Sequence, residues 1–549
     1  MSQESMVTSS SADAQPVDVL VVGMGPVGKM VALLLARAGH SVLVTDRKDA
    51  PYSLPRAVAH DAEVARILQN AGTPPDSMPD VVEPYDDMYV WVNGDDEVLH
   101  LVDWTGIDPS GWNNTYFYNQ PGLEAHLDAA VRKQPRVNVL RGTKAEVLSQ
   151  DDQGANVQLT TMSTSATSTV RATFVLGADG ANSDTRRGAG IEWKDLGYFF
   201  DWLVVDIVPE AGVKITHLAK QVADPSRPTT VVPAGPGRRR WEFMLLEGET
   251  WEEMARPERI WELLEPFGVR SDNARMERGV VYRFDSGWAA EWRKGRVILL
   301  GDAAHKMPPF AGQGLAAGFR DCINLAWKLD LVLRGIAEPS LLDSYGAERS
   351  DHVSDFIDFS MELGKIICIT DPVAAATRDA HMIAERESGR LPEPPPTPRI
   401  GTGLHIGEQG GYLSWQGQVS TADQSGSRRY DDVFGPGALI LDHLNLAAGL
   451  SAADFEALAT IGITVTTFAG GEVPSAAMVL PFIDAQGTYA AWFASIGARA
   501  VLVRPDFYVF GSATDTAGVE NLVAGFLDRI AGGARSLSSL DCAPDSRGR

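Results

Sequence analysis

The chain has 549 residues, of which 44% are hydrophobic and 22% charged, and its formal net charge is −24. At roughly 100–200 residues per domain, this length predicts about three or more folded units of ordinary globular composition. The negative charge argues against nucleic acid or an anionic membrane surface as the main partner. The cysteines Cys322, Cys368 and Cys542 lie far apart, which predicts no disulfide framework and no metal site and suits a reducing cytoplasm.

The two ends of the chain have the composition of disordered tails. Residues 1–16 are rich in serine and hold no lysine or arginine, so they lack the basic start and apolar run of a secretion signal. Residues 532–549 are small, polar and punctuated by proline and glycine. No apolar stretch approaches the roughly 20 residues that a membrane-spanning helix needs. We therefore expect a soluble cytoplasmic protein.

The first predicted element is a buried strand, Val17–Val22 (VDVLVV), followed by the glycine turn Gly23–Gly28 (GMGPVG). A helix over Lys29–Ala38 comes next, and a second strand over Ser41–Thr45 leads into Asp46. This is the G-x-G-x-x-G fingerprint in full context: the glycines permit a tight turn, a close approach of the backbone to a pyrophosphate, and close helix–strand packing. The segment predicts dinucleotide binding and does not distinguish NAD from FAD.

The middle of the chain is richer in predicted strands. These include residues 88–92 (MYVWV), 115–119 (TYFYN), 202–208 (WLVVDIV) and 238–244 (RRRWEFM). Leu391–Pro398 (LPEPPPTP) is expected to be extended. Beyond it, residues 435–530 show a compact α/β pattern that ends in a helix.

Two further motifs each follow an apolar strand. Residues 174–186 (FVLGADGANSDTR) carry D-G-x-x-S-x-x-R, and residues 296–305 (RVILLGDAAH) end in G-D-A-A-H. Residues 307–314 (MPPFAGQG) then open a helix that is predicted to run through Leu333. The three motifs, in this order and spacing, resemble the single-component flavin-dependent aromatic hydroxylases of the para-hydroxybenzoate hydroxylase fold. Segments 55–58 (PRAV), 119–124 (NQPGLE), 202–206 (WLVVD) and 240–243 (RWEF) resemble the meta-hydroxyphenylpropionate hydroxylase branch more closely.

The resemblance implies a mixed α/β fold of three domains. Residues 17–80, 119–190 and 286–390 are expected to form a Rossmann-like FAD domain, and residues 81–118 and 191–285 an inserted β-sheet substrate domain. Residues 391–433 are expected to be a linker. Residues 434–531 resemble the thioredoxin-like C-terminal domain of that branch, but without a redox C-x-x-C pair. We expect this domain to be structural, as a contact in a homodimer or as a packing cap.

The resemblance also implies the residues of the FAD site. They are Gly23, Gly25, Pro26, Val27 and Gly28 at the pyrophosphate; Asp46 at the ribose and Arg47 along the adenosine; Arg56 and Ala57 at the FAD phosphates or the nicotinamide; Gln120 at the ribityl chain; Val147 at the adenine; Asp179 and Gly180, for both FAD and NAD(P)H; Gly301 and Asp302 near the ribityl and pyrophosphate; and Pro309, Gly312, Gln313, Gly314 and Leu315 at the flavin ring.

The implied reaction is the hydroxylation of a small phenolic substrate. NADH or NADPH reduces FAD, O2 forms the flavin C4a-hydroperoxide, and one oxygen atom enters the ring of a phenol such as meta-hydroxyphenylpropionate. Pro308, Gly312 and Gly314 are expected to act at the flavin, because glycine backbone can approach the ring and the following helix start favours negative charge on it. His60 is a candidate base for the phenol proton, with a hydrogen-bonded structural histidine as the commoner role.

The substrate pocket is expected to draw its walls from the strand-rich segments. The candidates are Tyr116, Tyr118, Phe199, Trp202 and Trp241. Alternate residues on a strand point to opposite faces, so at most half of such a set lines one cavity. Three alternatives stay open: a polyketide-tailoring hydroxylase or Baeyer–Villiger enzyme on a fused-ring substrate, a flavin halogenase, whose W-x-W-x-I-P stretch is missing from the sequence, and an FAD-binding regulatory protein.

Overall fold

The computed structural model of the chain describes residues 15–51, 56–213, 215–389, 399–422, 426–468 and 478–532. By their contacts these residues form two compact units. Unit 1 takes its described residues from Met1–Tyr52, Leu127–Lys194 and Trp288–His305, and unit 2 from Ser53–His126, Asp195–Gly287 and Lys306–Arg549. The segment Leu391–Pro398, most of the two expected tails and Cys542 lie outside the described residues.

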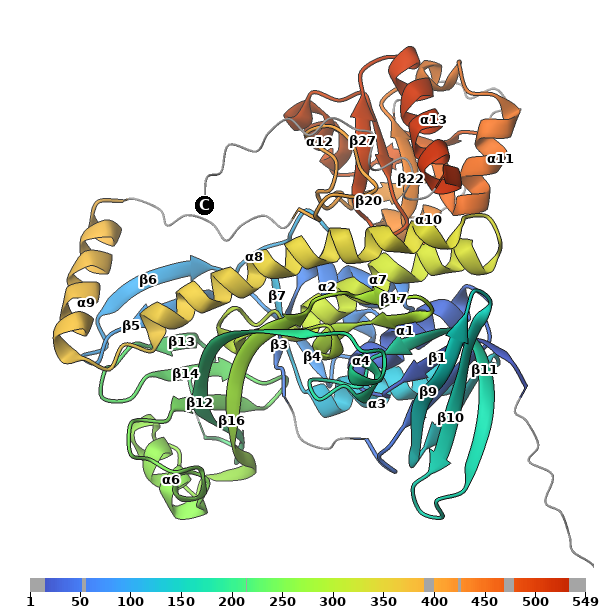
Figure 1. Cartoon of the computed structure of the whole chain (residues 1–549). Coiled ribbons are helices and arrows are strands. Elements are labelled where there is room, and N and C mark those ends of the chain that lie inside the picture. Colours follow the sequence, from blue (N-terminus) through green and yellow to red (C-terminus); the bar gives the residue numbers. More distant parts are fainter. Residues whose placement is uncertain are drawn as a thin grey trace, which may run out of the picture. The chain divides into compact units, whose positions relative to one another are not determined.

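Unit 1 is built around a sheet of mostly parallel strands. The strand β1 (Val17–Val22) pairs in parallel with β2 (Val42–Asp46) on one side and β11 (Thr167–Gly177) on the other. Its residues 19–21 are fully buried, as expected for a strand covered on both faces. The helix α1 (Pro26–Arg37) joins β1 to β2, which confirms the predicted strand–helix–strand unit (Figure 1). The other elements are β8 (Val137–Arg141), β9 (Thr143–Asp151), β10 (Gly154–Thr161), β17 (Arg293–Lys294), β18 (Val297–Leu299) and α4 (Asp184–Gly188).

Unit 2 contains a second large sheet, whose two faces have different roles. Its strands run in the order β19 (His305–Lys306), β16 (Ala274–Ala289), β12 (Trp193–Pro209), β15 (Arg239–Met244), β14 (Thr229–Pro233), β13 (Ala219–Val222), β5 (Met88–Val92) and β6 (Val98–Asp103). Trp241 and Phe243 pack on one face with the helices α5 (Trp251–Met254) and α6 (Pro257–Leu264). Tyr89, Trp91 and Val232 belong to the core on the other face.

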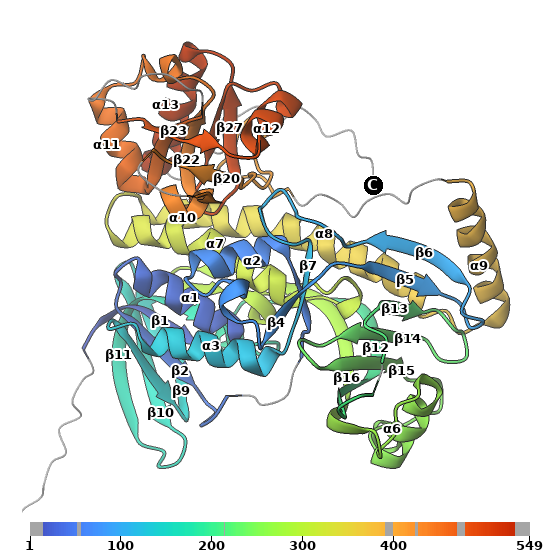
Figure 2. The same cartoon turned by 180° about the vertical axis from the view of Figure 1, so that it is seen from behind.

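Long helices and a small sheet surround the second face. The sheet consists of β3 (Ala59–Asp61), β7 (Thr115–Tyr118) and β4 (Val82–Tyr85). The helices are α2 (Ala62–Asn70), α7 (Gly314–Leu333), α8 (Asp343–Ile367) and α9 (Pro372–Glu387). The helix α3 (Gln120–Arg132) follows β7 and is divided between unit 2, up to His126, and unit 1, from Leu127. The helix predicted to run through Leu333 is confirmed as α7. Figure 2 shows α9 beside β5 and β6, and α9 packs on β6.

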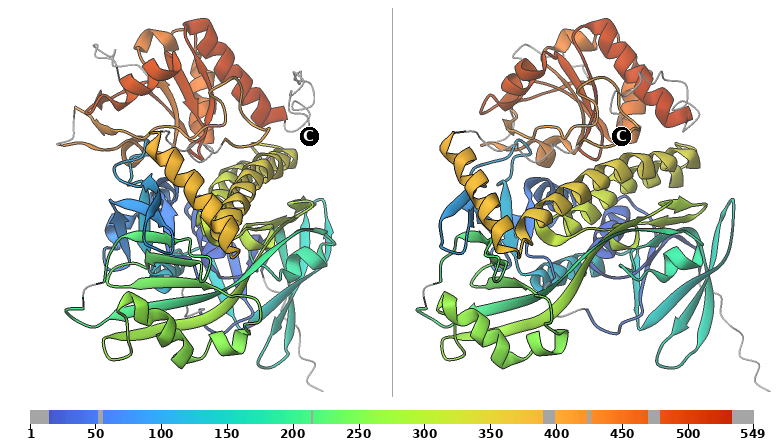
Figure 3. Two further views of the ribbon diagram at one scale, coloured as in Figure 1. Left: turned by 90° about the vertical axis from the view of Figure 1, so that its left-hand side faces the viewer. Right: turned by 60° about the vertical axis from the view of Figure 1, so that its left-hand side comes forward.

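The last part of unit 2 is a sheet with helices on both faces. Its strands run in the order β24 (Leu480–Pro481), β23 (Ile463–Thr467), β22 (Gly437–Leu441), β26 (Ala500–Val503) and β27 (Val509–Ala513). The helices α11 (Ala452–Ile461) and α13 (Thr516–Gly532) cover one face, and α12 (Thr488–Ile496) covers the other (Figure 3). This is the thioredoxin-like arrangement predicted from the sequence. Its α11–α13 side shares a hydrophobic core with Trp327 and Leu331 of α7.

The segment predicted as a linker, residues 391–433, contains regular elements where it is described. These are β20 (Gln418–Ser420), β21 (Arg428–Arg429) and the first four residues of α10 (Tyr430–Phe434), with β20 pairing with β25 (Ile483–Asp484). Leu404, Val419 and Tyr430 are buried, so this part of the chain is packed into unit 2. Among the described residues, no helix is both long enough and apolar enough to span a membrane.

Candidate functional site

The glycine turn of unit 1 uses each of its three glycines differently. Gly23 has φ +103°, and a Cβ there would overlap the carbonyl oxygen of Ala178. A Cβ on Gly28 would overlap the carbonyl oxygen of Gly23, because α1 packs directly on the turn. A Cβ on Gly25 would meet no atom within 4 Å, so the space beside this backbone is open. The helix α1 begins with no side-chain cap and no acidic residue in its first turn, which suits a bound phosphate.

Asp46, at the end of β2, is tied to the glycine turn itself. Its Oδ2 accepts a hydrogen bond from the backbone N–H of Met24 (3.0 Å), and its Oδ1 accepts one from the N–H of Lys48 (2.8 Å). An ionised carboxylate has about four lone-pair sites, so positions remain for ribose hydroxyls. The neighbouring Arg47 has an exposed side chain, 3.7 Å from the carboxylate of Asp184.

Asp179 stabilises the fold of unit 1 through its carboxylate. It accepts hydrogen bonds from Oγ of Ser183 (2.5 Å) and from the backbone N–H (2.9 Å) and Oγ1 (3.0 Å) of Thr185. These bonds hold the start of α4. At Gly180, with φ +81°, a Cβ would meet no atom within 4 Å. The open side of this motif is therefore the backbone at Gly180, not the carboxylate.

Gly301 lies against the same turn. It has φ +57°, and a Cβ there would stand 3.0 Å from Cγ2 of Val27. Asp302 is exposed beside it, and Val147 is half-buried in β9. Because Val22, Gly177 and Leu299 are in register at the ends of parallel strands, the three motifs that follow them share one edge of the sheet. Ligands of open α/β sheets bind at this edge.

In unit 2, Gln120 holds the Arg56–Ala57 pair. Its Oε1 accepts hydrogen bonds from the backbone N–H groups of Arg56 and Ala57, both at 2.7 Å, and its Nε2 donates to Glu124 (2.9 Å). The side chain of Arg56 is exposed. Gln120 thus fixes the backbone of this pair, and its expected contact with the ribityl chain stays a prediction.

The loop of residues 308–315 in unit 2 presents open backbone before α7. Gly312 has φ +68°, and a Cβ on Gly312 or Gly314 would meet no atom within 4 Å. The helix α7 starts at Gly314 without a side-chain cap and without an acidic residue in its first turn. Oγ of Ser360 donates a hydrogen bond to the carbonyl of Pro308 (2.7 Å), which fixes the start of the loop. Open glycines and uncapped helix starts therefore occur in both units, and the residues present fit FAD.

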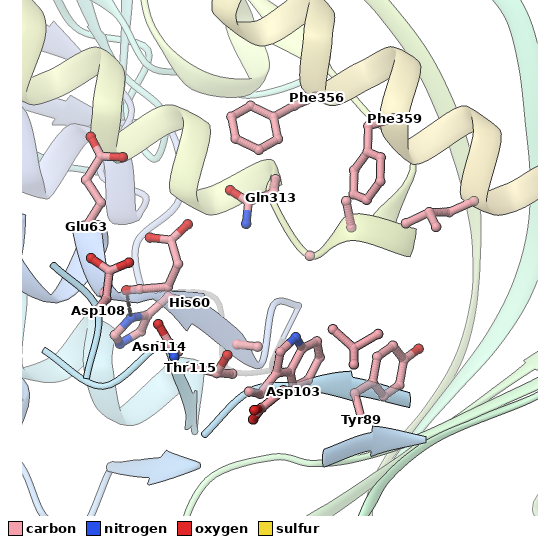
Figure 4. A pocket seen from close by; sticks show the side chains of 18 of the residues that line it. His60, Glu63, Tyr89, Asp103, Asp108, Asn114, Thr115, Gln313, Phe356 and Phe359 are labelled. Atoms are coloured by element: carbon pink, nitrogen blue, oxygen red, sulfur yellow. Dashed lines mark hydrogen bonds between the residues drawn. The ribbon is translucent and has the colours of Figure 1, made fainter. Parts of the chain in front are cut away.

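Unit 2 also contains a partly open cavity of about 1840 Å³ that includes this loop. Figure 4 shows Gln313, Phe356 and Phe359 on one side of it and Tyr89 and Thr115 on the other. Its wall is rich in aromatic side chains: Tyr89, Trp91, Trp104, Phe117, Phe310, Phe356, Phe359, Trp415 and Trp492. The wall also carries seven carboxylates, Asp61, Glu63, Asp103, Asp108, Glu242, Glu385 and Glu408, against two arginines, Arg320 and Arg386.

None of the five predicted wall residues lines this cavity. Thr115 and Phe117 line it, so Tyr116 and Tyr118, which alternate with them on β7, point to the other side. Trp241 is buried on the opposite face of the large sheet. Phe199 is 55% exposed, and Trp202 packs behind the loop with its ring 5.7 Å from that of Phe310.

His60 lines the cavity, but its free nitrogen does not face it. Its Nδ1 is 2.9 Å from the carbonyl oxygen of Asp61, an interaction drawn in Figure 4, and its ring stacks on Tyr116 at 5.0 Å. Its Nε2 is buried and has no hydrogen-bond partner among the described residues. Burial lowers the pKa of His60, which favours the neutral imidazole. The predicted role as substrate base stays a prediction, and the packing fits a structural histidine better.

Sequence reasoning missed the charged cluster at the loop, centred on Arg320 of α7. Arg320 donates hydrogen bonds to Glu63 (2.6 Å), to Asp61 (2.5 Å) and to the side-chain oxygen of Gln313 (2.7 Å). A signal was present, because Arg320, Asn324 and Lys328 recur every four residues in a helix that is mostly apolar and so share one buried face. Polar residues on such a face need partners from elsewhere in the fold.

Glu242 was also missed, although its neighbour Trp241 was a candidate. It lies on the cavity face of β15, where its side chain is 15% exposed and 3.6 Å from Arg240. Burial raises the pKa of Glu242, and Arg240 only partly offsets this effect.

Two family models match the chain. The model described as FAD binding domain matches residues 16–360, and the model described as HcaD C-terminal domain matches residues 411–529. The first match covers the motifs of both units described above.

Similar proteins match over nearly the whole chain. A protein of Rhodococcus jostii named "Probable NADH-specific resorcinol 4-hydroxylase" is 37% identical over 95% of this chain and 98% of its own length. A 3-(3-hydroxy-phenyl)propionate/3-hydroxycinnamic acid hydroxylase of Burkholderia cenocepacia is 31% identical over 92% of this chain and 96% of its own.

Solved structures show the same fold. The flavin-dependent monooxygenase PieE, in complex with FAD and substrate, matches 96% of this chain and 100% of its own with a TM-score of 0.77 at 21% identity. Aklavinone-11 hydroxylase, in complex with FAD and aklavinone, matches 94% and 100% with a TM-score of 0.74 at 23% identity.

Proposed function

Because the chain belongs to the family of FAD-binding hydroxylases, we propose that it uses FAD and NADH or NADPH to insert one oxygen atom of O2 into a phenolic ring. FAD, when bound, supplies the redox chemistry: it takes electrons from the nicotinamide and activates dioxygen. The rest of the work falls to residues of this chain, which bind the ring, orient its hydroxyl and exclude water.

The observation that carries the proposal is the cavity of unit 2. It includes the Pro309–Gln313 loop, which we propose lies at the flavin ring, and its aromatic wall suits a flat ring. Phe310 belongs to the loop itself, and Phe356 and Phe359 face the cavity from α8. These apolar side chains shield from water the part of a bound ring that they contact.

The charge of the cavity supports a neutral phenol as substrate. Asp61 and Glu63 neutralise Arg320, which leaves five lining carboxylates and Arg386. A substrate carboxylate entering this wall meets a net negative charge, whereas a phenol hydroxyl donates a hydrogen bond to it. We propose a hydroxybenzene without a carboxylate, of the kind named for the Rhodococcus relative.

The first test compares two phenols that differ in charge. We expect resorcinol to stimulate NADH oxidation and to yield a hydroxylated product, with kcat/KM at least about 10-fold above that for 3-(3-hydroxyphenyl)propionate, about 1.4 kcal/mol of discrimination. NADH consumption, peroxide release and product are measured together. A preference for the propionate would contradict the neutral substrate and favour a role for Arg386 as its anchor. Protein that takes up no FAD would contradict the proposed function altogether.

Glu242 is proposed to accept the hydrogen bond of the substrate hydroxyl. Glu242→Gln is expected to raise KM for the phenol about 10-fold, with a smaller change in kcat, because it removes a charged acceptor. Since burial raises the pKa of Glu242, the wild-type KM should fall as pH rises through that pKa, and the glutamine variant should lose this dependence.

The matched control is Glu210→Gln, at an exposed carboxylate that follows β12 outside the cavity wall. It should leave KM and its pH dependence unchanged. Equal KM values for Glu242→Gln and wild type at all pH values would show that Glu242 does not bind the substrate hydroxyl.

The cavity, which includes the proposed flavin loop, also leaves room for a second candidate, a fused-ring phenol. Its 1840 Å³ exceeds the roughly 300–1,000 Å³ of typical small-molecule pockets. A dihydroxynaphthalene in the same assay tests this candidate, which requires a higher kcat/KM than that of resorcinol. The expected cytoplasmic location and homodimer stay predictions.

A further inference from the structure

The turn between β26 and β27 is unusual because its polar side chains are buried. Arg504, Asp506, Phe507 and Tyr508 are at most 1% exposed. Turns ordinarily lie at the surface, since buried backbone and charges need partners. This turn, residues 504–508, belongs to the thioredoxin-like domain but finds its partners on other parts of unit 2.

Residues of three helices, α2, α7 and α8, contact the turn. Arg504 donates hydrogen bonds to both carboxylate oxygens of Glu348 in α8 (2.8 and 2.7 Å), and the side-chain amide of Asn324 in α7 donates one to Asp506 (3.0 Å). The guanidinium of Arg66 in α2 lies over the ring of Phe507, 4.5 Å from its centroid. The turn is therefore fixed from several sides.

From this turn a chain of hydrogen bonds reaches the loop of residues 308–315. The hydroxyl of Tyr508 donates to Oε1 of Glu63 (2.7 Å), and Nε of Arg320 donates to Oε2 of the same carboxylate (2.6 Å). Arg320 then donates to the side-chain oxygen of Gln313 (2.7 Å). Three hydrogen bonds thus connect the C-terminal domain to a residue of that loop, and Glu63, Arg320 and Gln313 all line the cavity.

The backbone of the turn is strained at Phe507, next to the residue that binds Glu63. Phe507 has φ +72°, a conformation that bulky residues rarely adopt. Such strain persists only where the surroundings over-determine it, and here it lets Asp506, Phe507 and Tyr508 reach three different partners. A glycine at this position would relieve the strain but would lose the ring that packs under Arg66.

We propose that Tyr508 is a positioning residue of the active site, which acts through Glu63 and Arg320 to set the orientation of Gln313 at the flavin loop. The thioredoxin-like domain then has a role in the reaction that needs no dithiol. In detail, the Tyr508 hydroxyl fixes one oxygen of Glu63, so the other oxygen meets Arg320 in one geometry. The inference depends on the proposed function only for those tests that measure hydroxylation of a phenol.

The test compares two buried tyrosines of the C-terminal domain. Tyr508→Phe removes only the hydroxyl that binds Glu63. Tyr430→Phe removes an equally buried hydroxyl, which lies 2.7 Å from Oγ1 of Thr466 and does not contact the cluster. Both variants should lower the Tm of the apoprotein by a similar small amount, because each loses one hydrogen bond.

The readouts that separate them concern FAD and the coupling of the reaction. Tyr508→Phe should raise the Kd of the apoprotein for FAD about 3- to 10-fold, shift the visible absorption of the bound flavin and increase the ratio of peroxide to hydroxylated product. Tyr430→Phe should change none of these. If the two variants have the same FAD affinity and spectrum, the turn is only a packing contact and the proposal is wrong. FAD affinity is measured without a phenol, so this result stands even if the proposed substrate class fails.

A double-mutant cycle tests the path through Glu63. In the Glu63→Gln background, Tyr508→Phe should change the Kd for FAD less than about twofold, because its partner is already altered. Fully additive effects would show that Tyr508 does not act through Glu63 and would overturn the assignment.

Discussion

Alanine in place of Gly25 is expected to lower the affinity for FAD at least about 100-fold while leaving the apoprotein folded. Gly25 has φ −76°, which alanine adopts freely, and its Cβ would meet no protein atom within 4 Å. That open space lies beside the backbone that is proposed to approach the pyrophosphate, so a methyl group there displaces the phosphates. Losing one or two hydrogen bonds to a charged group, at about 1.5–3 kcal/mol each, gives this magnitude. Fluorescence titration of the apoprotein with FAD measures the affinity, and thermal unfolding measures the fold.

Gly28→Ala is the matched control for this prediction. Its Cβ would overlap the carbonyl oxygen of Gly23, so the helix α1 must move away from the turn even without a ligand. We expect this variant to lower the Tm of the apoprotein as well as the affinity for FAD. If Gly25→Ala also destabilised the apoprotein, or bound FAD normally, the space beside Gly25 would not be the pyrophosphate site.

The glycine turn was predictable because its signal is local. A strand, three glycines, a helix and an acidic residue lie within 30 residues. Gly28 is required by the backbone of Gly23 and Gly23 by the backbone of Ala178 after the neighbouring strand, whereas the space beside Gly25 is open. The same holds for α7, whose start at Gly314 follows from the glycines before it. The fold class followed from such motifs taken in order.

The cavity wall was not predictable in the same way. On β7 the sequence TYFY places Thr115 and Phe117 on one face and Tyr116 and Tyr118 on the other. The sequence of the strand does not indicate which of these pairs lines a cavity. The prediction chose Tyr116 and Tyr118, whereas Thr115 and Phe117 of β7 line this cavity. A one-residue shift of register exchanges the faces of a strand, so composition alone does not decide between them.

The cluster around Arg320 required the tertiary fold. Glu63 and Tyr508 lie 445 residues apart, and Arg66 and Asp431 lie 365 apart. The segment RPDFY of residues 504–508 has the composition of an ordinary surface turn, but here it is buried. Only the packing of the C-terminal domain on α2, α7 and α8 reveals its partners.

The largest effect on stability is expected at Glu348, in the second turn of α8. Its carboxylate is fully buried and accepts hydrogen bonds from Lys328 (2.7 Å), from Asn324 (2.8 Å), from the backbone N–H of Leu404 (2.6 Å) and from Arg504. Glu348→Gln removes the negative charge that faces Lys328 and Arg504. Lys328 then stays buried without its carboxylate partner, and Arg504 keeps only Asp506. Breaking such a buried pair costs about 3–5 kcal/mol of the free energy of unfolding. Thermal and urea unfolding of the apoprotein, at pH 7, measure the loss.

The pH dependence of stability gives an independent check on the same carboxylate. Burial alone raises the pKa of Glu348, but Arg504 and Lys328 outweigh burial and hold the pKa well below its ordinary value. The folded pKa is therefore lower than the unfolded one, about 4.3, so the ionised group stabilises the fold above that pH and loses this contribution as pH falls further. The Tm of the wild-type protein should thus fall steeply below about pH 5. The Tm of Glu348→Gln should be lower at pH 7 and should fall less as the pH is lowered.

Glu362→Gln is the control, at an exposed position of the same helix that pairs with Lys365. Its Tm should follow the wild-type curve, because exposed ion pairs contribute little to stability. Parallel curves for wild type and Glu348→Gln would mean that the carboxylate is not ionised in the folded protein, and the ion pairs that dock the C-terminal domain would have to be reassigned.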